Sequence, residues 1–104
     1  TGRLIYCDYD MGQVSTGRQG VFKCYQISID MGQQRISGHA SGSYAQALED
    51  LNKNLKQMGL SLLVAGNSRD YEQTGLSFES GYGYIRGVKE PVSLMAPYTH
   101  SMTV

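Results

Sequence analysis

Residues 43–59, with the sequence SYAQALEDLNKNLKQMG, decide the fold of this chain, because only here do apolar side chains repeat at helical spacing. The side chains that share one helix face are Tyr44, Leu48, Leu51, Leu55 and Met58. Ser43 with Gln46 fits a capping box at the helix start, and Gly59 fits a left-handed cap at its end. We therefore predict one helix over residues 43–58, with this apolar face packed on the core.

The rest of the chain is typical of short strands joined by turns. Residues 3–9 and 20–29 are rich in β-favouring residues, 33–39 form a more polar strand, and 60–65 are a short apolar run that favours a central strand. Later strands are expected at 76–78, at 82–86 and, at a sheet edge, at 92–95. Within 20–29, the residues expected to face the core are Val21, Lys23, Tyr25, Ile27 and Ile29. The pattern predicts an α+β fold, in which the helix packs across one face of an antiparallel sheet of about five strands.

The tetrad Asp-Met-Gly-Gln occurs twice, at residues 10–13 and 30–33. An aspartate can accept hydrogen bonds from nearby backbone amides, and glycine tolerates positive φ, so each copy is expected to form a turn after a strand. The repeat is too short to indicate a duplicated fold.

Length and charge limit the classes of protein. A chain of 104 residues is expected to form one domain over 1–104, with 97–104 as a loose tail. Nine basic and nine acidic residues cancel, so no net charge attracts nucleic acid or an anionic membrane. The sequence contains neither an apolar run of membrane-spanning length nor a charged-then-apolar leader, and we expect a cytoplasmic location without membrane contact.

Signatures of catalysis are not found in the sequence. Cys7 and Cys24 are expected to be free thiols in strands, with a disulfide across a hairpin as the alternative. His39 and His100 are the only histidines, and no nucleophile elbow, HExxH or P-loop is present. We predict a protein that is not an enzyme and holds no cofactor. A small hydrolase or nuclease using His39, with Cys7, Cys24 or Asp8 nearby, is the main alternative.

Metal binding is also not expected. Asp8 and Asp10 share one face of an extended strand, and Asp30 joins them only if the two tetrads are neighbours. Three carboxylates suffice to hold calcium loosely, but aspartates in turns usually bond their own backbone. The sequence therefore predicts no metal site.

The second half of the chain is rich in tyrosine and arginine, the residue types that concentrate binding energy at protein interfaces. The predicted partner-binding residues are Arg69, Asp70, Tyr71, Glu72, Phe78, Glu79, Tyr82, Tyr84 and Arg86. Stacking of nucleic-acid bases on the tyrosines is the competing interpretation, but the nearby acidic side chains repel phosphates. A protein partner is therefore preferred. A third hypothesis is a self-assembling module, in which an exposed edge strand near Gly83 pairs with its own copy.

Residues 42–51, GSYAQALEDL, are entered from a predicted strand that follows a β-hairpin. In this respect residues 21–57 resemble the strand-to-helix junction of HicB-type antitoxins. The chain lacks the Pro-Gly strand and the DNA-binding segment of that family. In size and plan it also resembles small cytoplasmic immunity proteins. These resemblances imply a non-enzymatic protein that binds and inhibits a cognate toxin, such as a nuclease.

Overall fold

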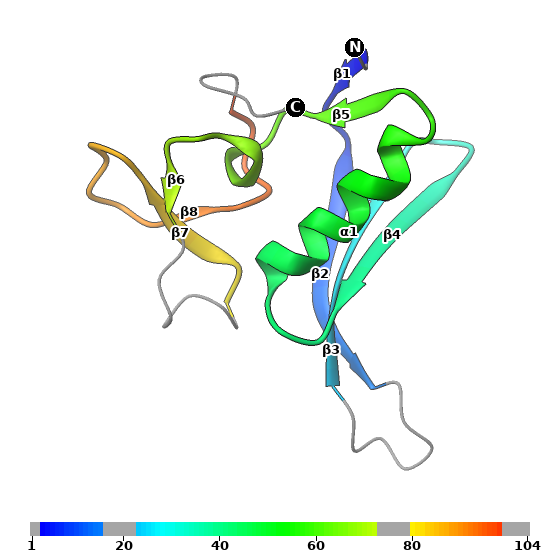
Figure 1. Cartoon of the computed structure of the whole chain (residues 1–104), viewed down its shortest axis with the longest axis horizontal. Helices are drawn as coiled ribbons and strands as arrows, with labels where there is room; N and C mark the ends of the chain where they lie inside the picture. The colour runs from blue at the N-terminus through cyan, green and yellow to red at the C-terminus, as the bar shows by residue number, and fades with distance from the viewer. Residues whose placement is uncertain (1–2, 16–22, 73–79, 99–104) are drawn as a thin grey trace.

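The protein was analysed as a computed structural model that describes residues 3–15, 23–72 and 80–98, with Ser15 and Lys23 described by their backbone alone. The elements in chain order are β1 (Arg3–Ile5), β2 (Asp8–Ser15), β3 (Lys23–Asp30), β4 (Arg35–Ala40), α1 (Tyr44–Lys56), β5 (Leu60–Leu62), the short 3-10 helix η1 (Ala65–Asn67), β6 (Tyr71–Glu72), β7 (Tyr82–Ile85) and β8 (Val92–Ser93). The predicted α+β class is confirmed, and the strands are divided among three small sheets (Figure 1).

The main sheet has the order β2-β3-β4 and is antiparallel, with Ile27 opposite Met11 on one side and Gly38 on the other. Helix α1 covers one face of this sheet (Figure 1). Ile27 and Ile29 are fully buried against the helix, and the Tyr25 ring makes an edge-to-face contact with Tyr44 at 4.9 Å between centroids. The predicted core face of this strand is therefore confirmed for these described residues.

Helix α1 approaches β4 most closely at Gly38. A Cβ at this position would lie 2.3 Å from the Leu51 amide nitrogen and 2.4 Å from the Ala47 carbonyl oxygen. Only glycine allows the two backbones to pack at this spacing. Asp50 and Asn54, from the same helix, form hydrogen bonds with outward-pointing backbone groups of β4, as discussed below.

The ends of α1 agree with the sequence prediction. The Ser43 hydroxyl accepts a hydrogen bond from the Gln46 amide at 3.2 Å, and Gly59 follows the helix with φ +73°. The predicted apolar face is buried from Tyr44 to Leu55. Met58 is an exception: it lies beyond the last helical residue and is 43% exposed. The buried face of the helix therefore ends at Leu55.

The two Asp-Met-Gly-Gln tetrads differ in structure. The copy at 30–33 forms the predicted turn, because Gly32 has φ +86° and its amide donates to Asp30 Oδ1 at 2.8 Å. The prediction is wrong for the copy at 10–13, which runs through the middle of β2. Its residues pair along their whole length with β3, and this cross-strand pairing overrides the local turn preference.

The predicted central strand at 60–65 is shorter than expected. Only Leu60–Leu62 are a strand, which pairs in parallel with β1, and the chain then turns into η1. The turn is stabilised by Asn67, whose amide donates to the Leu62 carbonyl at 3.0 Å and pairs with the Asn52 amide of α1. Asn67, which is buried, thus holds the turn that follows the strand.

The third sheet has the order β6-β7-β8. Strand β7 is the central strand of this sheet, with Gly83 opposite Val92 of β8, so the expectation that Gly83 lies on an edge strand is wrong. Self-assembly itself stays a prediction. This sheet lies beside α1 (Figure 1) and is joined to the core by Leu94 and Met95, both fully buried. Residues 76–78, where a strand was expected, lie outside the described part of the chain.

The start of the expected loose tail is held in place. Pro97 forms a bridge with Val64, and the Tyr98 amide donates to the Leu63 carbonyl at 3.2 Å. Residues 99–104, including His100, lie outside the described part of the chain.

Candidate functional site

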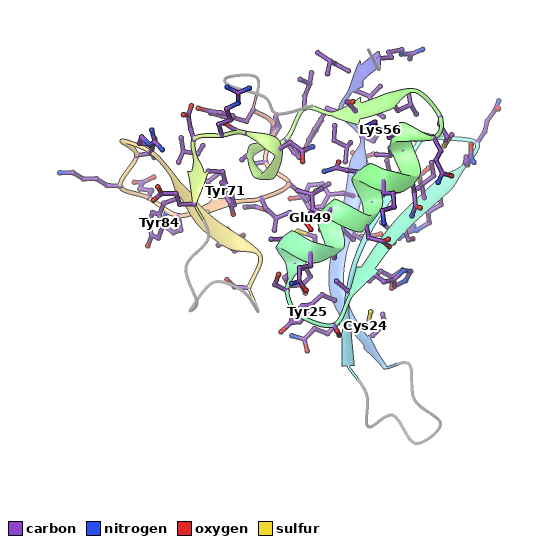
Figure 2. All side chains as sticks on the ribbon, in the orientation of Figure 1. Cys24, Tyr25, Glu49, Lys56, Tyr71 and Tyr84 are labelled. Carbon is purple, nitrogen blue, oxygen red and sulfur yellow. The ribbon has the colours of Figure 1, made fainter. Side chains whose placement is uncertain are left out.

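Strand β7 exposes two tyrosines on one face. Tyr82 is 48% exposed and Tyr84 is 41% exposed, whereas Gly83 and Ile85 between and beside them are buried. Glu72 of β6 lies directly opposite Tyr84, so its exposed carboxylate is on the same face. We call these three residues, Glu72, Tyr82 and Tyr84, the tyrosine face. Figure 2 shows Tyr84 on the side of the hairpin away from α1.

The tyrosine face is supported from behind by Tyr71. A Cβ on Gly83 would lie 2.8 Å from the Tyr71 ring and 2.4 Å from the Glu72 carbonyl oxygen, so the ring packs directly on the glycine. The Tyr71 hydroxyl donates to the Val92 carbonyl at 3.1 Å, which ties β6 to β8. Burial raises the pKa of Tyr71 well above its ordinary value. Tyr71 is therefore a half-buried inner residue rather than part of the exposed face.

Asp70 is also engaged within the fold. Its carbonyl oxygen accepts from the Arg86 amide at 2.7 Å, and its carboxylate accepts from the Tyr98 hydroxyl at 3.3 Å. Partial burial and the Asp70 carboxylate both raise the pKa of the Tyr98 phenol. Asp70 thus anchors the base of the hairpin, while the side chains of Arg69 and Arg86 remain exposed beside it.

The seven described residues among the nine predicted partner-binding residues therefore divide into three groups. The structure brings Glu72, Tyr82 and Tyr84 together on one exposed face and turns Asp70 and Tyr71 inward. Arg69 and Arg86 are exposed at the hairpin base. Phe78 and Glu79 lie outside the described residues.

The described charges around the tyrosine face balance. Arg69, Arg86 and Lys89 carry three positive charges, and Asp70, Glu72 and Glu90 carry three negative ones. A balanced surface gives no long-range attraction for phosphates. The tyrosine face therefore offers ring surfaces and short-range polar groups rather than a net charge.

A second surface, which the sequence prediction missed, is the polar face of the main sheet away from α1, where Ser28 is buried and Gln26 and Ser37 are half-buried. Its central residues are Ser28 and Ser37, whose hydroxyl oxygens are 2.7 Å apart, and Gln26, whose amide nitrogen donates to both at 3.2 and 3.4 Å. Arg35 of β4 reaches across to form an ion pair with Asp10 of β2. A turn at residues 10–13 would leave them unpaired with β3, so the sequence prediction did not include this polar face. The alternation of polar residues at Gln26 and Ser28 was its visible signal.

The residues considered for catalysis are not assembled into a site. Cys7 packs against the core cluster on the helix side of the sheet, whereas Cys24 belongs to the opposite face, so the two thiols are free. The His39 amide donates to Asp50, and its side chain is exposed without a hydrogen bond to a described nucleophile. Burial, together with the charges of Asp8 and Asp30, raises the pKa of Cys7, which disfavours its thiolate.

The described part of the chain contains no cluster of histidine, cysteine or acidic residues arranged to hold a metal ion. Asp8 lies opposite Asp30 in the pairing of β2 with β3. However, the Asp10 carboxylate forms an ion pair with Arg35, and the Asp30 carboxylate accepts a hydrogen bond from the Gly32 amide of its own turn. No described helix is long and apolar enough to cross a bilayer.

Comparisons with protein-family models, with curated proteins and with solved structures find no match to this chain.

Proposed function

We propose that this chain is a non-enzymatic binding protein of the immunity or antitoxin kind, which acts in the cytoplasm by binding and inhibiting a cognate toxin. The observation that carries the proposal is the exposure of Tyr82 and Tyr84 on one face of a sheet whose other face is fixed in the core. The class of partner rests on the resemblance of residues 42–51 to the HicB-type junction. The choice of surface rests on the exposed tyrosines.

The physical basis is the cost of ordering a binding surface. A tyrosine ring brings a large contact area with few rotatable bonds, and its hydroxyl can bond across an interface. Here the backbone beneath the rings is held by Tyr71 and by the bond from the Leu94 amide to the Gly81 carbonyl at 2.9 Å. A partner therefore has little backbone to order when it binds.

The test is a binding measurement with the proteins encoded by adjacent genes, by native mass spectrometry and calorimetry. Tyr82→Ala and Tyr84→Ala are each expected to weaken the complex by about tenfold or more, because exposed tyrosines at the centre of an interface are common hot spots. Tyr9→Ala is the matched control, since Tyr9 is also a surface tyrosine, at 37% exposure, but lies on β2.

Two results would contradict the proposal. One is that no neighbour-encoded protein forms a stable complex, and the other is that both tyrosine variants bind and inhibit as the wild type does.

The hydrolase alternative predicts an activity that His39→Ala abolishes. The self-assembly alternative predicts a concentration-dependent sedimentation profile without any partner.

A further inference from the structure

Gly12 is a glycine that the fold itself does not require. It lies in the middle of the eight-residue strand β2, where glycine is unfavourable because it lacks a side chain to pack. Its φ is not positive, and a Cβ built on it would meet no atom within 4 Å. Gly38 and Gly83 are different, because backbone or ring atoms occupy the space at those positions.

The absence of a side chain at Gly12 creates a hollow in the polar face of the main sheet. The hollow has a volume of about 330 Å³ and is lined by Asp10, Met11, Val14, Gln26, Ser28 and Arg35 around the glycine. Asp10, Gly12 and Val14 follow one another along the same face of β2, with Gln26 directly opposite the glycine. One end of the hollow is therefore charged, and the apolar side chain at the other end is Val14, since Met11 points to the opposite face of β2.

The charged end presents both signs. Arg35 and Asp10 pair with each other, and their side chains are 56% and 74% exposed. An exposed pair of this kind is weak, so a ligand can replace each partner at little cost. Arg35 offers planar paired donors suited to a carboxylate, and Asp10 offers acceptors suited to an ammonium group. The side-chain amide of Gln26, which also lines the hollow, carries an oxygen that can serve as a second acceptor.

We propose that this hollow binds a free α-amino acid with an aliphatic side chain. The ligand carboxylate bonds Arg35, its ammonium group bonds Asp10 and Gln26, and its side chain lies over Gly12 against Val14. A zwitterion fits because the opposite charges stand together at one end. An aliphatic side chain fits because the other end is apolar. This site is on a different sheet from the tyrosine face, so the two proposals fail or succeed independently.

The experiment is a titration of the isotope-labelled protein with free leucine, in which NMR measures the amide chemical shifts at each leucine concentration. Leucine has about nine non-hydrogen atoms, and a ligand of this size in an open hollow is expected to bind with a Kd of about 1 mM. We expect shifts confined to residues 10–14, Gln26, Ser28 and Arg35. N-acetylleucine lacks the ammonium group and leucinamide lacks the carboxylate, and each is expected to bind about tenfold more weakly.

Two variants test the role of the hollow. Gly12→Val fills it and is expected to abolish the shifts while leaving the melting temperature equal or higher, because valine favours strands and its Cβ would meet no atom within 4 Å. Gln13→Val is the matched control, since it makes the same kind of change on the opposite face of β2 and should bind leucine as the wild type does. Arg35→Gln, at an exposed position, removes the carboxylate partner and is expected to weaken binding of leucine but not of leucinamide.

The proposal is overturned if leucine at about 10 mM, a concentration roughly ten times a Kd of about 1 mM, shifts the amide signals of none of the lining residues. It is also overturned if Gly12→Val binds as the wild type does, or if the blocked derivatives bind as well as free leucine.

Discussion

Tyr71 shows how a single side chain couples the two outer strands of the third sheet. Its ring packs on Gly83 and its hydroxyl donates to the Val92 carbonyl. The neutral phenol is favoured in the folded state, because burial raises its pKa above the ordinary value of 10.0. In the unfolded chain the same phenol ionises near that ordinary value. The contribution of Tyr71 to stability is therefore present below about pH 10 and is lost as the pH rises further.

We expect Tyr71→Phe to remove this dependence on pH. Below about pH 9 the wild type should be more stable by about 1 kcal/mol, the usual contribution of one hydrogen bond. Above pH 10 this advantage should shrink by at most about 1.4 kcal/mol per pH unit, since one proton is released on unfolding. Urea denaturation of both proteins between about pH 8 and pH 11 measures the difference. Tyr84→Phe, which removes an exposed hydroxyl, is the matched control, and an advantage that stays constant across this range contradicts the expectation.

At the scale of elements, α1 protects the outer edge of β4. The Asp50 carboxylate accepts a hydrogen bond from the His39 amide at 2.9 Å, and the Asn54 amide donates to the Ser37 carbonyl at 2.9 Å. Both backbone groups belong to an edge strand, where unpaired groups are a template for pairing with another chain. Helix α1 therefore covers one face of the sheet and also satisfies its edge.

The double variant Asp50→Ala with Asn54→Ala is expected to expose this edge. Each lost bond should cost about 1–2 kcal/mol of unfolding free energy, and more for the charged acceptor. Sedimentation at increasing concentration should then detect self-association that the wild type does not show. Glu49→Ala, at an exposed position of the same helix, is the control. A double variant that stays monomeric would show that the edge is protected by something other than these two side chains.

The elements differ in how far local sequence determines them. The span, cap and end of α1 could be predicted, because the apolar period, Ser43 and Gly59 all act locally. The strand through residues 10–13 could not be predicted in this way. Its pairing with residues 25–28 joins segments that are distant in the sequence, and this pairing outweighs the local turn preference. The polar hollow could not be predicted for the same reason. It exists only once Gly12 and Gln26 face each other across two strands.

At the scale of the whole molecule, the third sheet has no core of its own. Tyr71 of β6 packs against the cluster under α1, and Leu94 and Met95, which directly follow β8, are fully buried within that cluster. Gly66 of η1 lies between the Leu48 side chain and Leu94, and its amide donates to the Leu94 carbonyl at 2.7 Å. We therefore expect the tyrosine face to unfold together with the helix-covered sheet, because both sheets contribute to one core.

Leu94→Ala tests whether the two sheets unfold together. Removing this fully buried side chain should cost about 2–5 kcal/mol, the range for a leucine truncated in a packed core. Amide signals from Tyr84 in the third sheet and from Leu51 in α1 should be lost at the same denaturant concentration in the wild type, and together at a lower concentration in the variant. Val88→Ala, at a 45% exposed position, should leave both signals unchanged. If Tyr84 loses its signal at a clearly lower denaturant concentration than Leu51 in either protein, the third sheet unfolds separately. The tyrosine face then lacks the rigid support that lowers the entropy cost of binding a partner.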